Sequence, residues 1–224
     1  MKNNLIYLLG GILLLFNACA GSETSSEKST GIIENSISDS SEKPIILFFG
    51  NSLTAGYGLD EDETFPYLIG GKLEQDGLEY KVVNAGLSGD TSASGLSRLD
   101  WFLEEEPAVF VLELGANDGL RGIDLAETKS NLKSILTKVR SKYPETVLIL
   151  AGMQIPPNMG PEYTARFAEI YPEVAQEEQV YLIPFLLEGV AGDPDLNLPD
   201  GIHPTAEGQK IVAATVWTHL KGLL

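Results

Sequence analysis

The sequence predicts an α/β protein: a doubly wound, mostly parallel sheet of five strands in three layers, α/β/α. Two observations predict it. Short apolar runs alternate along the chain with longer segments of helical periodicity, which is the rhythm of βαβ units. The first such run, residues 45–49, is apolar at every position, as expected of a strand covered on both faces. In sheets of this kind, ligands bind beyond the carboxyl ends of the strands.

The elements are expected in strict alternation. Strands are expected at residues 45–49, 80–83, 109–114, 147–151 and 180–183. Helices are expected at residues 65–75, 92–102, 125–143, 163–177 and 205–220. Apolar residues three and four apart give the longest of these helices one face that can pack on the sheet. Thr205 is a suitable N-cap for the last helix, and Pro204 prevents an earlier start.

The N-terminal residues are not expected to belong to the globular domain, which we place at residues 44–224. Residues 1–18 contain a lysine near the start, an apolar run and then small residues, which is the plan of a secretory signal peptide. The run is shorter than the roughly 20 residues that a transmembrane helix needs. Residues 19–43 are rich in serine, glutamate, threonine and glycine, which is typical of a flexible tether.

The only cysteine of the chain, Cys19, follows the apolar run directly. Its position resembles the lipidation site of bacterial lipoproteins, although Phe16 and Asn17 depart from the usual pattern. The resemblance implies an exported bacterial membrane lipoprotein, attached through lipidated Cys19 on the periplasmic or cell-surface face. The alternative is an ordinary cleaved signal with an incidental cysteine. A single cysteine excludes an internal disulfide.

The formal net charge is −17, which opposes binding to nucleic acid or to anionic head groups. No nucleic-acid partner is therefore expected. The glycine-rich patterns of nucleotide-binding loops are absent from the sequence. We expect a monomer.

Three turns marked by glycine follow the first three strands, at one edge of the expected sheet. Ser52 comes just after Gly50, so its hydroxyl can face the ligand crevice. Gly89 lets the backbone approach a bound group and point its N–H at it. Asn117 offers an uncharged donor suited to a developing oxyanion. Each also has an ordinary structural reading: a helix cap, a tight turn before a helix capped by Asp90 or Thr91, and a loop asparagine.

A fourth segment near the end of the chain contains Asp200 and His203, framed by Gly201 and Pro204. The other histidine, His219, falls in the last expected helix. A carboxylate on one ring nitrogen of His203 holds the tautomer and leaves the other nitrogen free to take a proton. The alternative is a purely local hydrogen bond in the loop.

Together, residues 50–53, Gly89, residues 115–118 and residues 200–204 resemble the four sequence blocks of SGNH (GDSL) hydrolases, in order. The wider stretches 88–91, 113–122 and 200–204 are similar to the branch that contains bacterial thioesterase I, arylesterases and lysophospholipases. The resemblance implies Ser52 as nucleophile, His203 as general base and Asp200 as its orienting acid. It also implies an oxyanion hole made by the N–H groups of Ser52 and Gly89 and the side chain of Asn117, without metal or cofactor. One departure is Asn51, where the family usually has aspartate.

The implied function is hydrolysis of acyl esters or thioesters through an acyl-enzyme, with short or medium acyl esters and lysophospholipids as substrates. After the fourth strand, Met153, Ile155, Pro156 and Asn158 lie in a segment that resembles the mobile substrate loop of thioesterase I relatives. A plain surface loop is the alternative there. Two other functions stay open: a carbohydrate esterase that removes acetyl groups from glycans, and a catalytically silent binding lipoprotein. An α/β-hydrolase is disfavoured, because no Gly-Xaa-Ser-Xaa-Gly stands at a strand–helix turn.

Overall fold

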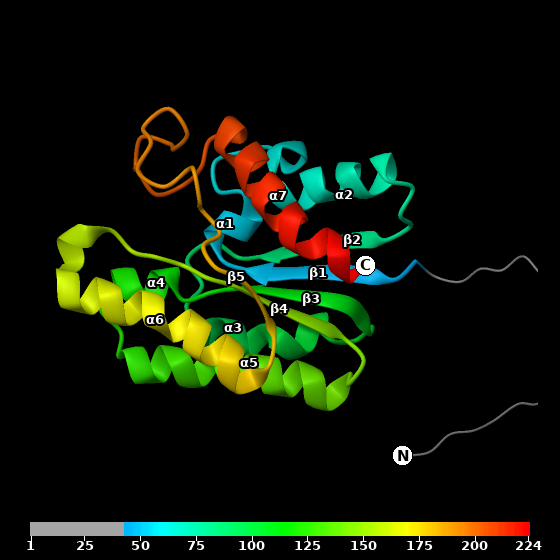
Figure 1. Ribbon diagram of the computed structural model, residues 1–224, viewed down its shortest axis with the longest axis horizontal. Coiled ribbons are helices and arrows are strands. Elements are labelled where there is room, and N and C mark those ends of the chain that lie inside the picture. Colours follow the sequence, from blue (N-terminus) through cyan, green and yellow to red (C-terminus); the bar gives the residue numbers. More distant parts are fainter. Residues whose placement is uncertain (1–42) are drawn as a thin grey trace, which may run out of the picture. The chain divides into compact units, whose positions relative to one another are not determined.

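The computed structural model describes residues 43–224, and Figure 1 shows a twisted sheet with helices on both faces. All four strand pairings are parallel, and the strand order is β2-β1-β3-β4-β5. The strands are β1 (Ile45–Gly50), β2 (Lys81–Gly86), β3 (Pro107–Glu113), β4 (Val147–Ala151) and β5 (Tyr181–Ile183). The predicted three-layer α/β architecture with a five-stranded sheet is confirmed.

The helices divide between the two faces of the sheet, as Figure 1 shows. One face carries α2 (Phe65–Gln75) and α7 (Ala206–Leu220), which pack against each other. The other carries α3 (Ser92–Arg98), α5 (Leu125–Lys142) and α6 (Pro161–Glu178). Short helical segments are α1 (Ser52–Ala55), α4 (Ala116–Leu120), and the 3-10 turns η1 (Glu61–Glu63), η2 (Leu99–Phe102), η3 (Pro157–Met159) and η4 (Lys221–Leu223).

Most expected bounds agree with the structure to within a few residues, and two differences have clear physical causes. The second strand continues to Gly86, beyond the expected end at residue 83, because it stays in register with β1 up to Gly50. The expected helix at 92–102 is α3 followed by η2, so the segment is helical throughout but tightens at Leu99. Thr205 caps α7, as predicted, by accepting from the N–H of Gly208.

The core lies on both faces of the central strands. Phe48 and Phe49 of β1 point to opposite faces, and neither is exposed. On one side Phe65 of α2 meets Phe48 edge-on, with ring centroids 5.4 Å apart. On the other side Phe49 packs against Phe110 of β3 at 5.7 Å. This two-sided burial explains the uninterrupted apolar run, and it makes β1 and β3 a rigid base for the turns that follow them.

No helix within residues 43–224 is long and apolar enough to cross a membrane. Residues 1–42 include the predicted signal peptide, Cys19 and nearly all of the predicted tether, and they lie outside the described residues.

Candidate active site

The site lies where the winding of the sheet reverses. The chain passes from β1 to its neighbour β2 and then crosses to β3 on the other side of β1. The turns after these three strands meet at the carboxyl edge, which is where open α/β sheets form a crevice. Ser52 begins α1 directly after β1, Gly89 lies in the turn after β2, and Asn117 lies in α4 after β3.

Ser52, His203 and Asp200 form one hydrogen-bonded chain, although Ser52 and His203 are 151 residues apart. The Nε2 atom of His203 lies 2.8 Å from Ser52 Oγ, and its Nδ1 atom lies 2.8 Å from Asp200 Oδ2. In the tautomer with the proton on Nδ1, the ring donates to the carboxylate and accepts from the serine hydroxyl. That is the arrangement in which an imidazole removes a proton from a nucleophile. The catalytic roles themselves stay a prediction.

The loop that delivers His203 is held by its own hydrogen bonds. Asp200 Oδ1 accepts from the N–H groups of Ile202 and His203, at 3.0 and 3.1 Å. Burial acts to raise the pKa of Asp200, but these N–H bonds and the His203 ring outweigh it and hold the pKa below its usual value. The carboxylate is therefore ionised and oriented. Its contacts with both backbone and ring fix the imidazole relative to the loop.

The start of α7 ties the histidine loop to the nucleophile turn through Gln209. The buried side chain of Gln209 accepts from the N–H of Phe65 at 2.9 Å and donates to the carbonyl of Leu53 at 3.3 Å. Leu53 follows the nucleophile. The start of α7 and the turn that carries the nucleophile are therefore joined behind the site as well as across it.

Tyr57 covers one face of the imidazole. Its ring centroid lies 4.5 Å from that of His203, with the planes tilted by 35°, and the side chain is half exposed. Sequence reasoning missed this residue. The only signal was an aromatic residue between two glycines, Gly56 and Gly58, shortly after the nucleophile.

The predicted oxyanion donors lie at the same edge of the sheet. Asn117 lines the same pocket as Ser52, and its Nδ2 donates to the carbonyl of Asp90 at 2.8 Å. An amide nitrogen carries two hydrogens, so this bond orients Asn117 and leaves its second N–H for a ligand. Gly89 has φ +87°, a left-handed conformation that suits glycine. Its carbonyl accepts from Arg121 Nη2 at 3.0 Å, which holds the turn against α4.

Buried charged residues lock the three turns together, a role that was not predicted from the sequence. Arg98 of α3 pairs with Asp90 and donates at 3.0 Å to the carbonyls of both Gly50 and Ala85. One guanidinium therefore connects the end of β1, the end of β2 and the turn after β2. Asp118 of α4 accepts from the N–H of Ser92 at 2.8 Å and joins α4 to α3. Thr91 is the cap of α3.

Asn51 connects the nucleophile to a second buried acid, Glu113 at the end of β3. Asn51, not Ser52, caps α1, and its Oδ1 accepts from the N–H of Leu53 at 3.0 Å. The carboxylate of Glu113 accepts from Asn51 Nδ2 at 2.6 Å and from Thr54 Oγ1 at 2.9 Å. Burial raises the pKa of Glu113 to about 7, against the lowering effect of the hydrogen bonds from Asn51 and Thr54.

A pocket of about 430 Å³ opens beside Ser52 and His203. Its far wall is largely apolar and includes Leu120, Met153, Ile155, Pro156, Phe185 and Leu187. The structure thus places three of the four predicted substrate-loop residues in the wall. Asn158 is exposed and is not part of that wall, because within the turn η3 it is the neighbouring Pro157 that lines the pocket.

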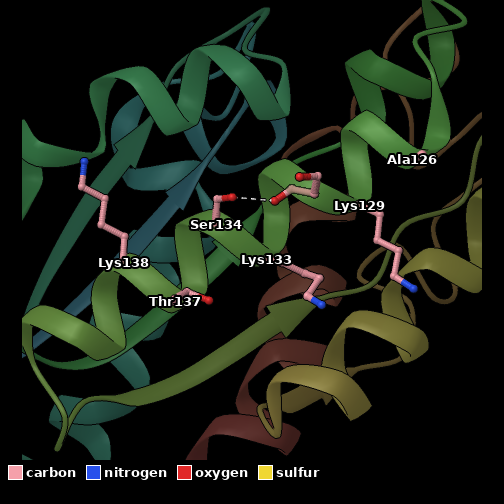
Figure 2. Close-up of a pocket in the computed structure, with 7 residues that line it drawn as sticks. Ala126, Lys129, Lys133, Ser134, Thr137 and Lys138 are labelled. Atoms are coloured by element: carbon pink, nitrogen blue, oxygen red, sulfur yellow. Dashed lines mark hydrogen bonds between the residues drawn. The ribbon is translucent and has the colours of Figure 1, made fainter.

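A second hollow, of about 650 Å³, lies on the outer side of α5 and is drawn in Figure 2. Lys129, Lys133 and Lys138 project from the helix there, and the hydroxyl of Ser134 donates to a carbonyl one turn earlier. Lys129 and Lys133 both pair with Glu177 of α6. None of the seven lining residues belongs to the chain of Ser52, His203 and Asp200. This surface is a solvated, ion-paired helix face.

Comparison with known proteins agrees with this geometry. Esterase TesA from Pseudomonas aeruginosa is 44% identical over 180 residues, which cover 80% of this chain and 89% of that protein. Thioesterase 1/protease 1/lysophospholipase L1 from Escherichia coli K12 is 37% identical over 180 residues, which cover 80% of this chain and 84% of that protein.

Among solved structures, the psychrotrophic esterase EstA from Pseudoalteromonas sp., in a form inhibited by monoethylphosphonate, superposes with a TM-score of 0.76. It is 32% identical, and the match covers 80% of this chain and 98% of that chain. Residues 48–211 match the GDSL-like lipase/acylhydrolase family over a segment that contains every residue of the site described above. The chain therefore belongs to the GDSL-like lipase/acylhydrolase family.

Proposed function

We propose that the protein is a serine esterase in which Ser52 is the nucleophile, His203 the general base and Asp200 the acid that orients the base. One observation carries the assignment of roles: the continuous chain Ser52 Oγ, His203 Nε2, His203 Nδ1, Asp200 Oδ2, with 2.8 Å at each contact between side chains. The relatives named above are esterases and a thioesterase, which supports hydrolysis of ester bonds.

The reaction proceeds by two acyl transfers. His203 takes the proton of Ser52 as its oxygen attacks the substrate carbonyl, and the resulting oxyanion accepts from Ser52 N–H, Gly89 N–H and Asn117 Nδ2. The imidazolium then protonates the leaving alcohol or thiol, which departs and leaves an acyl-enzyme. Water, deprotonated by His203, attacks that ester; the acid is released and the proton returns to Ser52.

Labelling tests the nucleophile directly. A fluorophosphonate should phosphonylate Ser52 with loss of fluoride, and mass spectrometry of the digested protein should find the adduct on that residue. Ser52→Ala should lose labelling and nearly all ester turnover, while its circular dichroism stays that of the wild type. Wild-type turnover in purified Ser52→Ala would overturn the assignment. Absence of any label on the folded wild type would favour a catalytically silent binding protein.

We further propose short or medium acyl esters, including lysophospholipids, as substrates. The apolar wall of the 430 Å³ pocket, which starts at the nucleophile, supports an acyl chain as the group bound there. The test compares kcat/KM for p-nitrophenyl acetate, p-nitrophenyl octanoate, a lysophosphatidylcholine and an acetylated xylan fragment. Preference for the acetylated glycan would replace this substrate class with the carbohydrate esterase alternative.

Finally, we propose that the enzyme is an exported monomer held at a bacterial membrane by acylated Cys19. The export and the membrane attachment rest on the sequence of residues 1–19 alone. Expression of the full chain in a bacterial host should give a membrane fraction in which the mass of the N-terminal peptide shows acylation. Cys19→Ser should be released in soluble form. Light scattering of residues 44–224 tests the monomer.

A further inference from the structure

A buried carboxylate lies behind the nucleophile and takes no part in the proton transfers described above. Glu113 is 2% exposed. Its Oε1 accepts from Asn51 Nδ2 at 2.6 Å, and its Oε2 accepts from the backbone N–H of Asn51 at 3.0 Å and from Thr54 Oγ1 at 2.9 Å. A Cβ at Gly50 would lie 2.6 Å from Oε2, so only glycine fits there. We call Gly50, Asn51, Thr54 and Glu113 the Glu113 cradle.

The other end of the Asn51 amide faces the nucleophile. Asn51 Oδ1 accepts from the N–H of Leu53 at 3.0 Å and lies 3.3 Å from Ser52 Oγ. A half-turn of the amide would set its NH2 against the Leu53 N–H, and its oxygen against Glu113 Oε1. Donor would then face donor and acceptor would face acceptor, between buried side chains. The acceptor on Glu113 and the donor on Leu53 therefore select one orientation of Asn51.

We propose that Glu113 is a positioning residue for the nucleophile: through Asn51, it keeps an acceptor oxygen beside the Ser52 hydroxyl and fixes the turn that aims this hydroxyl at His203. The inference rests on the proposed function of Ser52. If the amide turned over, its NH2 would donate to Ser52 Oγ, occupy a lone pair needed for attack and release the cap of α1.

The same contacts show what the amide of Asn51 supplies to the cradle. In this chain an amide donor meets the Glu113 carboxylate, so the cradle holds one acid. An aspartate at position 51 would place two carboxyl groups face to face.

Other ionisable groups reach the backbone on either side of the cradle. Arg98 of α3, paired with Asp90, donates to the carbonyl of Gly50. Tyr171 of α6 donates to the carbonyl of Leu114 at 3.0 Å. Asp118 of α4 and His203 are further titratable groups of the surrounding turns. The raised pKa of Glu113, about 7, lies between pH 6 and pH 9. The protonation of Glu113 therefore changes over the pH range of the experiment below.

Three variants separate positioning from a merely structural role. Glu113→Gln offers one acceptor oxygen where two acceptor positions are needed, so one bond to Asn51 fails. Asn51→Asp faces Glu113 with a second carboxyl, which is tolerated while the pair shares a proton and repels once the proton leaves. In the double variant, which combines Asn51→Asp with Glu113→Gln, the new amide at position 113 donates to the new carboxylate at position 51. The oxygen of that amide accepts from the backbone N–H of position 51 and from Thr54. Every bond of the cradle is then restored.

The experiment measures the rate constant for fluorophosphonate labelling of Ser52, together with kcat and KM for p-nitrophenyl butyrate, from pH 6 to pH 9. Glu113→Gln should label about 10- to 100-fold more slowly, mainly through kcat. The double variant should return to within about three-fold of the wild type. The deficit of Asn51→Asp should grow as pH rises. Thr146→Val, which removes a buried threonine bond to the carbonyl of Pro107 at the other end of β3, is the matched control and should label within about three-fold of the wild type.

Three results would overturn the proposal: wild-type labelling of Glu113→Gln, a double variant no faster than Glu113→Gln, or equal losses in Thr146→Val and Glu113→Gln. If Glu113→Gln does not fold, Asn51→Asp decides, because a ratio to wild type that is constant from pH 6 to pH 9 contradicts positioning. An unlabelled wild type contradicts the proposed function instead. That outcome is distinguishable, because failure of positioning alone leaves the wild type fully labelled.

Discussion

Tyr57 packs on the face of His203, with their ring centroids 4.5 Å apart, so the proposed base is held from its face as well as from its edge. Asp200 and Ser52 contact the two ring nitrogens, and Tyr57 limits rotation out of that plane. The aromatic face also favours the positive charge that the imidazole carries during the reaction.

Removal of the Tyr57 ring should slow the reaction with little loss of stability. An aromatic pair contributes about 0.5–1.5 kcal/mol beyond its buried area, which corresponds to about 2- to 12-fold in rate. We therefore expect Tyr57→Ala to lower kcat by that factor and Tyr57→Phe to retain the wild-type kcat. Steady-state kinetics on one ester, with thermal unfolding of both variants, checks this. A loss in Tyr57→Phe equal to that in Tyr57→Ala would assign the effect to the hydroxyl.

Asn117→Ala should reduce kcat by about 10²- to 10³-fold, because one donor to the oxyanion is lost. KM should change little, since the donor acts mainly in the transition state. The lost bond to the Asp90 carbonyl should lower the free energy of unfolding by about 1 kcal/mol. Asn117→Asp is the companion variant, and its carboxylate should repel the oxyanion and lower kcat further. Turnover of Asn117→Asp above that of Asn117→Ala would remove Asn117 from the oxyanion hole.

Asp200→Asn should lower kcat by about 10²- to 10⁴-fold, because the amide no longer selects the tautomer with the proton on Nδ1. Hydrogen bonds hold the pKa of Asp200 below its usual value. The charge of Asp200 therefore stabilises the folded protein at every pH above the usual pKa of an aspartate, and this contribution is lost only in stronger acid. The difference in free energy of unfolding between the wild type and Asp200→Asn should therefore shrink in urea unfolding as pH falls below about 3.8. A difference that stays the same between pH 5 and strong acid would contradict the lowered pKa of Asp200.

As pH rises, Glu113 should lower the free energy of unfolding, whereas a surface acid paired with a lysine would raise it. Burial raises its pKa from 4.5 to about 7, so between these values the folded chain keeps a proton that the unfolded chain has released. The free energy of unfolding should fall by about 3 kcal/mol from this group as pH rises through the interval. Glu113→Gln should lack this decrease in urea unfolding at pH 5 and pH 7.5.

Glu177→Gln is the control for that measurement. Bonds from Lys129 and Lys133 lower the pKa of Glu177 to about 2, so its contribution is lost only as pH falls below about 4.5. The free energy of unfolding of Glu177→Gln should change between pH 5 and pH 7.5 in the same way as that of the wild type. Identical pH dependence in Glu113→Gln and the wild type would contradict the raised pKa of Glu113.

Leu120→Trp should shorten the preferred acyl chain, because Leu120 lines the pocket from α4 and is only partly buried, so a larger ring can enter the cavity. We expect kcat/KM for p-nitrophenyl octanoate to fall at least about 10-fold relative to the acetate. Leu120→Ala should shift the preference toward longer chains. An unchanged profile in both variants would place the acyl chain elsewhere.

The order of strands and helices was predictable from sequence because both faces of β1 and β3 are covered, which leaves long apolar runs. The grouping of Ser52, Gly89 and Asn117 at one edge followed from a general rule for parallel sheets. Asp200 and His203 could be placed beside them only through the family resemblance. Local pattern does not show where a loop 151 residues away will lie.

The supporting residues could not be predicted in the same way. Glu113 stands at the end of an apolar strand, and Arg98 in a short helix, where a single charged residue ordinarily faces water. Their burial depends on partners from other turns, namely Asn51 for one and Asp90 for the other. The places of the Tyr57 and Asn158 side chains depend on loop conformation, which hydrophobic periodicity does not define.

The distance along the chain between Ser52 and His203 also bears on biosynthesis. A ribosome makes Ser52 well before His203, so a nascent polypeptide that has not reached His203 lacks the proposed base. The proposed triad is complete only once β5 and the loop after it have been synthesised. Unfinished copies that stop before this loop should therefore be inactive toward esters.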